Sequence, residues 1–205
     1  MKLYYSPGAC SLAAHIVARE AGLALDLVKV DTATHKTEKG EDYFKINPRG
    51  YVPALEIDGE LHTEVAALVQ YLADQAPQSN LLPPAGSMER FKVQQWLAFI
   101  SSELHKTFGP WLFHAEAADS TKQAVRDKLA VRFAELEALF ATRSYLTGDT
   151  FTVADAYAFT IVNWSNFLKI DLKPYPHLSA FMARVAARPK VHEALKAERL
   201  ITAAA

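Results

Sequence analysis

The sequence has little cysteine, little net charge and no long apolar run, and each shortage excludes a class of protein. Its 205 residues contain one cysteine, which excludes an intrachain disulfide and a metal site built from several cysteines. The formal net charge is −1, which argues against a nucleic-acid or anionic-membrane surface. No run approaches the ~20 apolar residues of a membrane span, and the opening segment lacks a signal peptide's apolar core. We expect a soluble protein of a reducing compartment such as the cytoplasm, with no metal site.

Two regions of different pattern follow one another along the chain. Residues 1–77 alternate strand and helix patterns, in the order strand–helix–strand and then strand–strand–helix. This order predicts an α/β, thioredoxin-like domain with a four-stranded mixed sheet and helices on both sides. Residues 78–86 contain prolines and a glycine and are typical of a linker. Residues 87–205 show helical periods and no convincing strand, which predicts an all-α helical bundle.

The single thiol, Cys10, lies where a strand gives way to a helix. Lys2–Tyr5 is short and apolar like a buried strand, Pro7-Gly8 breaks it, and residues 11–18 favour a helix. A thiol at a helix start meets unpaired backbone N–H groups and the positive end of the helix dipole, which favour the thiolate. A lone cysteine is more often an inert buried residue, but this placement makes Cys10 the candidate reactive group.

Two further segments of the first region suit a small thiol peptide. Val52 precedes Pro53 and an apolar strand, so its backbone is a candidate to pair with an extended peptide, and the bond before Pro53 is a candidate cis bond. Glu64 and Val65 open a helix whose first amides could receive a carboxylate. Taken alone, Val52-Pro53 reads equally well as a turn, and Glu64 reads as an ordinary helix start. Together with Cys10 these segments predict a thiol-peptide site.

The helical region offers one polar segment and one folding motif. Ser101–Lys106 places Glu103 and His105 in an aromatic setting, where a histidine could hydrogen-bond a thiol or thiolate. The competing interpretation of this segment is an ordinary charged helix face. Thr152 and Asp155 have the spacing of a capping box, and we interpret Asp155 as a folding residue without a catalytic role.

Motifs in both regions make the chain resemble a glutathione S-transferase, specifically of the bacterial beta class. The most specific are Tyr-Ser-Pro-Gly-Ala-Cys10-Ser-Leu, Asn-Pro-Arg-Gly-Tyr-Val52-Pro53-Ala-Leu, Leu-His-Thr-Glu64, Ser-Glu-Leu-His105-Lys and Phe-Thr-Val-Ala-Asp155-Ala-Tyr. The resemblance implies a detoxification enzyme that conjugates the thiol of reduced glutathione to small hydrophobic electrophiles. Glutathione is then a co-substrate and no cofactor is expected. The resemblance also implies a homodimer.

The same resemblance implies roles for individual residues. Cys10 contacts the glutathione sulfur and forms a mixed disulfide with it, and His105 lies beside the thiol. The backbone of Val52 pairs with the cysteinyl part of glutathione, and Pro53 is the cis residue. The other implied glutathione contacts are Glu64 and Val65 at the γ-glutamyl end, with His35, Ser102, Glu103 and Leu104. The candidate electrophile wall is the aromatic set Phe108, Trp111, Phe113 and Trp164, for which plain core packing is the alternative.

Three positions depart from the family pattern. Val65 replaces a small residue, often serine, so only its amide can serve glutathione. Ala98 stands where the family often has an asparagine that reaches glutathione across the dimer. His35 stands where lysine is common and is a weaker cation at neutral pH. We therefore expect a glutathione site with weaker or differently distributed polar contacts.

Two other functions remain open at this point. In a redox reading, Cys10 takes glutathione as a mixed disulfide that a second thiol resolves, as in a one-cysteine, glutaredoxin-like cycle or a peroxidase side activity. In a reading from another class, the chain is a non-catalytic glutathione-binding or assembly module of the same fold. Cys10 together with His105 argues against the second reading.

Overall fold

The computed structural model describes residues 1–109 and 111–201, and the chain forms two compact units. The first unit is Met1–Leu82 together with the chain from Ala187 onward, and the second is Pro83–Ala186. The border after Leu82 falls inside the segment expected to be a linker. The last part of the chain groups with the first unit because its helix α9 (Pro189–Ala197) packs on α1 (Ser11–Glu20).

The first unit contains a mixed sheet with the strand order β3-β2-β1-β4-β5. Strand β1 is parallel to β2 and antiparallel to β4, while β3 and β5 extend the two edges in antiparallel fashion. The four expected strands are confirmed, and a two-residue strand within the polar segment 31–40 adds a fifth. The strands are β1 (Lys2–Tyr5), β2 (Asp26–Asp31), β3 (Lys36–Thr37), β4 (Ala54–Ile57) and β5 (Glu60–His62).

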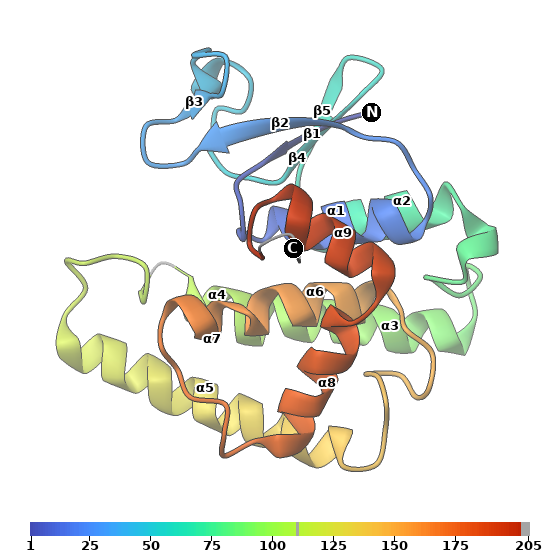
Figure 1. The fold of residues 1–205 in the computed structure, drawn as a ribbon, viewed down its shortest axis with the longest axis vertical. Coiled ribbons are helices and arrows are strands. Elements are labelled where there is room, and N and C mark those ends of the chain that lie inside the picture. The colour runs from blue at the N-terminus through green and yellow to red at the C-terminus, as the bar shows by residue number, and fades with distance from the viewer. Residues whose placement is uncertain (110, 202–205) are drawn as a thin grey trace. The chain divides into compact units, whose positions relative to one another are not determined.

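Both faces of this sheet are covered, by different means. Helices α1, α2 (Val65–Asp74) and α9 lie along one face (Figure 1), with α1 in contact with both of the others. Successive strand side chains point to opposite faces, so Leu3 and Tyr4 serve different layers. The second face carries a small apolar cluster that joins strand residues to the 3₁₀ turn η1 (Tyr43–Lys45). Its buried members are Tyr4, Val30, Tyr43, Val52 and Ala54. A second 3₁₀ turn, η2 (Pro77–Ser79), follows α2.

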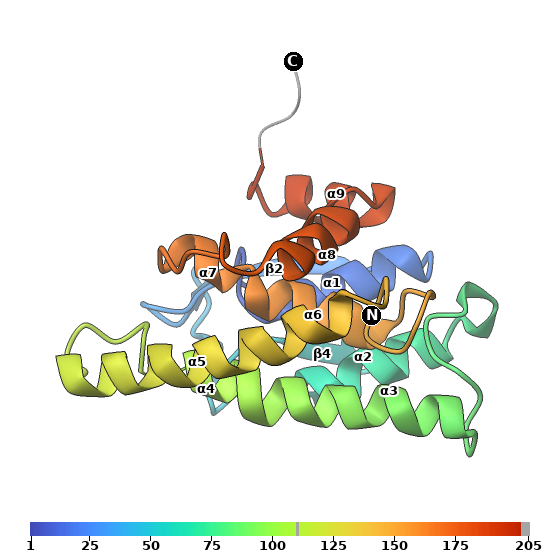
Figure 2. The same cartoon turned by 90° about the horizontal axis from the view of Figure 1, so that it is seen from below.

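The second unit is helical throughout its described elements (Figure 2). Helix α6 is its centre, because every residue of α6 is buried and the helix packs on α3, on η3 and on α8. The elements are α3 (Met88–Phe99), η3 (Ile100–His105), α4 (Lys106–Phe108), α5 (Asp119–Phe140), α6 (Val153–Val162), α7 (Trp164–Phe167) and α8 (Pro176–Ala186).

A capping box begins helix α6, as the sequence predicts. The carboxylate of Asp155 accepts the backbone N–H groups of Leu146 and Thr152, each at 2.8 Å, and the Thr152 hydroxyl at 3.0 Å. Asp155 is fully buried, so these three donors take the place of water around the carboxylate. The interpretation of Asp155 as a folding residue agrees with this geometry.

The apolar stripe of residues 88–113 predicts one long helix that Gly109-Pro110 should bend or end, and the structure has a different form here. The middle of the helical run, η3, is a π-helix, a wider turn that sequence periodicity does not reveal. The helical run ends at Phe108, immediately before Gly109, so Trp111 and Phe113 lie outside it. Pro110, which was expected to help end the helix, lies outside the described residues.

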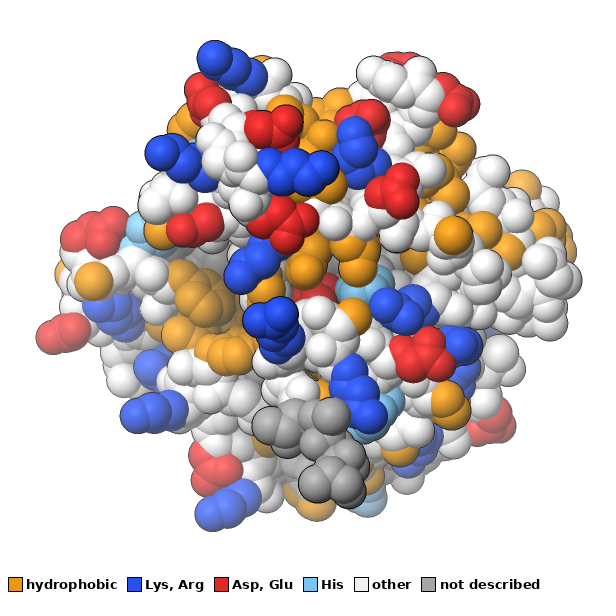
Figure 3. All heavy atoms as spheres, turned by 45° about the horizontal axis from the view of Figure 1, so that its top comes forward, with side chains coloured by type: hydrophobic (Ala, Val, Ile, Leu, Met, Phe, Trp, Pro, Cys, Tyr) orange, Lys and Arg blue, Asp and Glu red, His pale blue; other side chains and the backbone are white. Residues whose placement is uncertain are grey.

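One face of the surface shows the balanced charge of the sequence. On the face drawn in Figure 3, acidic and basic side chains are interspersed. In the described parts of the chain, no helix is long and apolar enough to cross a membrane. Nor do those residues contain a group of three or more His, Cys, Asp and Glu side chains that could hold a metal ion.

Candidate functional site

The structure brings Cys10 and Val52 together in the first unit. Cys10 is the N-cap residue of α1, and its half-buried thiol donates to the Val52 carbonyl oxygen, with Sγ 3.1 Å from that oxygen. The peptide bond between Val52 and Pro53 is cis. Two influences on the thiol oppose each other here. The helix terminus favours the thiolate, whereas the carbonyl oxygen accepts the S–H and favours the thiol.

The loop before Cys10 is held by a residue from near the end of the chain. The carboxylate of Glu198 accepts the backbone N–H of Gly8 at 2.9 Å and lies 2.9 Å from Nδ1 of His15 on α1. His15 and Glu198 are both buried, and Nε of Arg19 donates to the other ring nitrogen of His15 at 2.8 Å. Glu198 thereby ties together the loop and the helix that flank the thiol.

Glu64 and Val65 lie at the start of α2, as the sequence predicts. Glu64 is the N-cap residue and has a φ of 72°, a left-handed conformation that is uncommon for a residue with a side chain. Such conformations cost about 1–3 kcal/mol and concentrate at ligand sites. The exposed carboxylate of Glu64 accepts from Arg49 at 3.2 Å, and the Val65 side chain is buried. The amide of Val65 is thus the group that this residue can offer a ligand.

The ring of His35 is fixed by packing, whereas the lysine common at this position in the family has a flexible side chain. It has a φ of 51°, and its ring packs on Phe44 with the ring centroids 4.2 Å apart. A Cβ atom at Gly50 would lie 2.7 Å from Nδ1 of His35, so only glycine fits beneath this ring. Nδ1 of His35 is buried without a hydrogen-bond partner, which leaves Nε2 as the nitrogen able to reach a ligand.

His105 occupies the end of the π-helical segment in the second unit. Its Nδ1 lies 2.6 Å from the hydroxyl of Tyr157 on α6, and its ring meets those of Tyr157 and Trp164 edge-on. Burial, and to a smaller extent the charge of the neighbouring Lys106, lower the pKa of His105 to about 4. The imidazole is therefore neutral at physiological pH.

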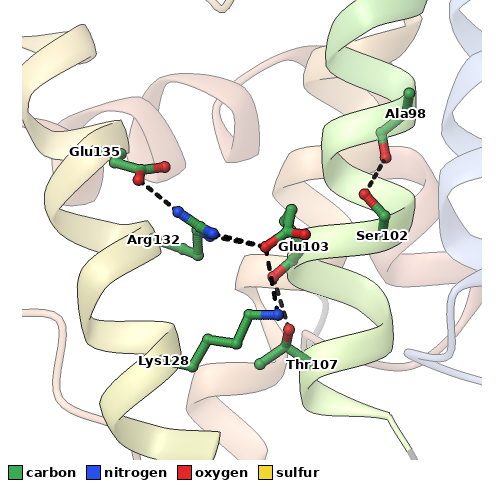
Figure 4. A network of polar contacts seen from close by, with 7 residues as sticks. All are labelled: Ala98, Ser102, Glu103, Thr107, Lys128, Arg132 and Glu135. Atoms are coloured by element: carbon green, nitrogen blue, oxygen red, sulfur yellow. Dashed lines mark hydrogen bonds and ion pairs between the residues drawn. The ribbon is translucent and has the colours of Figure 1, made fainter.

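The other predicted residues of this segment are held by neighbours in the same unit (Figure 4). One carboxylate oxygen of Glu103 accepts from Nε and Nη2 of Arg132, at 3.0 and 2.8 Å, and also pairs with Lys128. These charge-assisted hydrogen bonds lower the pKa of Glu103. The exposed hydroxyl of Ser102 donates to the Ala98 carbonyl at 2.9 Å, and Leu104 is fully buried.

Three of the four predicted aromatic residues lie together, with Phe108 and Phe113 on Trp164, which itself packs on His105. Trp164 meets Phe108 and Phe113 edge-on, with ring centroids 5.8 and 5.2 Å apart. Phe108 is fully buried and Trp164 nearly so, whereas Phe113 and Trp111 are about half exposed. The buried pair has the packing role that was the alternative for this set, and the exposed pair presents apolar surface.

Sequence reasoning missed three polar groups that support these residues. Tyr157 bonds His105, Arg132 bonds Glu103, and Glu198 bonds the loop before Cys10. Tyr157 is part of the motif at Asp155, but a tyrosine on an apolar helix reads as core. Arg132 and Glu198 lie 29 and 190 residues from their partners, a separation that local patterns do not bridge.

Comparison with known proteins agrees with the resemblance. The sequence model of the glutathione S-transferase N-terminal domain matches residues 8–75, and that of the C-terminal domain matches residues 96–189. Glutathione S-transferase GstA of Escherichia coli O157:H7 is 45% identical, over 98% of this chain and 100% of its own length.

Two solved structures are similar across the whole chain. A sphingomonad glutathione S-transferase complexed with glutathione is 45% identical, with a TM-score of 0.93, over 98% of this chain and 100% of that one. The bacterial beta-class enzyme of Sphingomonas chungbukensis is 44% identical, with a TM-score of 0.94 and the same coverage. The chain therefore belongs to the glutathione S-transferase family, and its relatives include the bacterial beta class.

Proposed function

We propose that this glutathione S-transferase conjugates the thiol of reduced glutathione to small hydrophobic electrophiles. The observation that carries the proposal is the placement of the Cys10 thiol at the head of α1, 3.1 Å from the Val52 carbonyl oxygen. A strand-like backbone group, a thiol and a helix N-terminus in one unit match the cysteinyl and γ-glutamyl parts of glutathione. A sphingomonad relative that is 45% identical has been solved with glutathione, which supports the same ligand here.

Glutathione would bind through backbone groups and charge. Its cysteinyl amide pairs with Val52 as an added strand, and its γ-glutamyl end meets Glu64 and the amide of Val65. When the cysteinyl N–H takes over the Val52 carbonyl, the Cys10 thiol loses its acceptor. The start of helix α1 then becomes the stronger influence on Cys10, and it favours the thiolate form. His35 offers Nε2 to the ligand, and Ser102 and Glu103 complete the polar contacts proposed for the helical unit.

The chemical step needs the glutathione thiolate. A free thiol has a pKa near ~8.5, so forming the thiolate at neutral pH costs about 1–2 kcal/mol without help. The amides at the start of α1 and the neutral imidazole of His105 are the groups proposed to give that help. Phe113 and Trp111 provide exposed aromatic surface for the electrophile, backed by Phe108 and Trp164.

A second activity is proposed on the basis of Cys10. Its thiolate attacks oxidised glutathione, forming a mixed disulfide and releasing one reduced glutathione. A second glutathione thiolate then attacks the mixed disulfide, which frees Cys10 and regenerates oxidised glutathione. With a mixed disulfide between a substrate thiol and glutathione in place of oxidised glutathione, Cys10 attacks the glutathione sulfur and releases the reduced substrate thiol, and the second step again yields oxidised glutathione. Cys10 must remain a thiol for this cycle, which supports a reducing compartment such as the cytoplasm.

We also propose that the protein is a homodimer in solution. The proposal rests on the family resemblance. Sedimentation equilibrium should give twice the 22.7 kDa mass of one chain, and a mass of one chain at micromolar concentration would contradict it.

The test of the main proposal is conjugation of glutathione to 1-chloro-2,4-dinitrobenzene by the wild-type protein and Glu64→Gln. The variant removes one charge at the proposed γ-glutamyl contact, so KM for glutathione should rise roughly tenfold, as for loss of one charge-assisted hydrogen bond. Glu60→Gln, a change at an exposed glutamate of the adjoining hairpin, is the matched control and should leave KM unchanged. Equal KM values in all three proteins would contradict the proposed site. No conjugation by the wild type would contradict the proposed activity.

A further inference from the structure

Tyr157 is a buried polar side chain that the proposed function does not yet use. Its residue is 1% exposed, and it lies on α6, the helix whose residues are all buried. Its hydroxyl is 2.6 Å from Nδ1 of His105, the imidazole proposed to assist the glutathione sulfur. The question is what this short hydrogen bond does to the imidazole.

The bond decides which ring nitrogen carries the proton. A neutral imidazole has one N–H and one acceptor nitrogen, and the partner of one nitrogen fixes the role of the other. A phenol is a much stronger acid than the N–H of a neutral imidazole, so the favourable arrangement has the Tyr157 O–H donating to Nδ1. The proton of the ring then resides on Nε2.

Packing holds the ring in this arrangement. The rings of Tyr157 and His105 are perpendicular, with centroids 5.8 Å apart, and Trp164 packs edge-on against the imidazole from another helix at 5.1 Å. Burial, together with Lys106, keeps the imidazole neutral by lowering its pKa to about 4. A neutral ring with Nδ1 occupied can act through Nε2 as a hydrogen-bond donor.

We propose that Tyr157 is a positioning residue that fixes His105 as the Nε2–H tautomer, so that the imidazole donates a hydrogen bond to the glutathione sulfur. This inference rests on the role of His105 in the proposed function. Donation to sulfur stabilises the thiolate and lowers the pKa of the bound glutathione thiol. His105 is then a donor to the nucleophile and does not remove its proton.

The first test reads the tautomer without any activity assay. Ring ¹⁵N chemical shifts of His105, from long-range ¹H–¹⁵N correlation spectra at pH 7, should show Nε2 protonated in the wild type. In Tyr157→Phe the two nitrogens should move toward the averaged shifts of mixed tautomers. Tyr175→Phe is the matched control, because Tyr175 lies in the same unit and its hydroxyl makes only a long, 3.4 Å contact with the Ala130 carbonyl. Protonation of Nδ1 in the wild type, or unchanged shifts in Tyr157→Phe, would overturn the proposal.

The second test measures the pKa of the bound glutathione thiol. Thiolate absorbance of bound glutathione near 240 nm, followed against pH, should give a higher thiol pKa in Tyr157→Phe than in the wild type. The conjugation rate at pH 6.5 should fall roughly threefold to tenfold, as for loss of one neutral hydrogen bond, and the deficit should close at alkaline pH. In a His105→Ala background, Tyr157→Phe should have no further effect. An equal deficit at every pH, or an unchanged thiol pKa in the single variant, would overturn the proposal. If the wild type binds no glutathione, the proposed function fails separately from the tautomer result.

Discussion

At the scale of single residues, Cys10 is held between a helix terminus and a carbonyl oxygen. The thiol donates to the Val52 carbonyl oxygen, and the N–H groups at the start of α1 favour a thiolate. The reactive form of Cys10 therefore depends on what else bonds the Val52 carbonyl. This dependence makes the two proposed activities separable, because conjugation uses the sulfur of glutathione whereas disulfide exchange uses the sulfur of Cys10.

Cys10→Ala should separate the two activities. Conjugation should persist within roughly tenfold of the wild-type rate, because the proposed imidazole and helix-terminus contacts to the glutathione sulfur remain. Disulfide exchange should be lost, because its attacking thiol is gone. Intact-protein mass after incubation with oxidised glutathione should show one glutathione adduct on the wild type and none on the variant. An adduct on Cys10→Ala, which lacks any thiol, would contradict the assignment.

His105 makes the stability of the protein sensitive to acid. Its pKa is about 4 in the folded chain and about 6.5 in an unfolded chain, so the unfolded chain binds more protons between these values. Stability from the neutral, buried imidazole is therefore fully present above pH 6.5 and falls as the pH drops toward 4.

The prediction is read from unfolding free energies at two pH values. Between pH 7 and 4.5, the wild type should lose about 2 kcal/mol more than His105→Gln, measured by urea unfolding followed by tryptophan fluorescence. His114→Gln replaces an exposed histidine and should behave like the wild type. Equal losses in the wild type and His105→Gln would show that His105 titrates as an exposed imidazole.

At the scale of elements, the helical unit is organised by the start of α6. The capping box satisfies backbone groups of Leu146 and Thr152 through one buried carboxylate. The helix it begins carries Tyr157, so the fold of this element also sets the position of the His105 partner. Helix α6 thus carries both the capping box and Tyr157, the hydrogen-bond partner of the candidate site residue His105.

Asp155→Ala should destabilise the protein strongly. The change leaves two buried N–H groups and one hydroxyl without their acceptor, and it should cost about 2–4 kcal/mol of unfolding free energy. Urea unfolding followed by circular dichroism measures this loss. Asp149→Ala, at an exposed position in the same loop, should change stability by less than about 0.5 kcal/mol. Similar losses of unfolding free energy in the two variants would contradict the folding role of Asp155.

The sequence predicted elements well where local chemistry decides them. The helix after Cys10 and the capping box at Thr152 both follow from residues within a few positions of one another. The π-helix was missed, because the π-helical turn leaves no period that differs clearly from that of an α-helix. Strand β3 was missed because two residues are too few to carry a pattern.

The residues of the candidate site were predictable where they stand in local motifs, as the elements were. Cys10, Val52 and Glu64 stand in distinctive motifs, and the structure places Cys10 against Val52 and Glu64 at a helix start. The partners that hold these groups were not predictable, since Glu198 and Arg132 act across long stretches of chain. Glu103 was expected to contact glutathione, and in the structure its carboxylate is bonded by Arg132 and Lys128.

At the scale of the whole molecule, the chain returns at its end to the unit where it began. Helix α9 packs on α1, and the fork between Arg188 and Glu20, at 2.7 and 2.8 Å, adds a second tie near the start of α9. Glu198 then bonds the loop that carries Cys10. The first unit is thus complete only when the last helix has been added.

Glu198→Ala should therefore weaken both the fold and the thiol site. Removing the buried carboxylate leaves the N–H of Gly8 and the Nδ1 group of His15 without their acceptor, which should cost about 2–4 kcal/mol of unfolding free energy. Urea unfolding should show this loss, and Cys10 should react faster with iodoacetamide as its loop loosens. Glu193→Ala removes a half-exposed carboxylate on the preceding helix α9 and should cost less than about 1 kcal/mol. Unchanged stability and thiol reactivity in Glu198→Ala would contradict the role of this contact.

The most direct test of the central claim is a crystal structure of the protein soaked with reduced glutathione. The account predicts that the cysteinyl N–H and C=O of glutathione lie within about 3 Å of the backbone oxygen and nitrogen of Val52, with the glutathione sulfur beside Sγ of Cys10. The γ-glutamyl end should reach Glu64. Glutathione bound away from Val52, or a Cys10 thiol that stays on the Val52 carbonyl oxygen with the ligand present, would contradict the account.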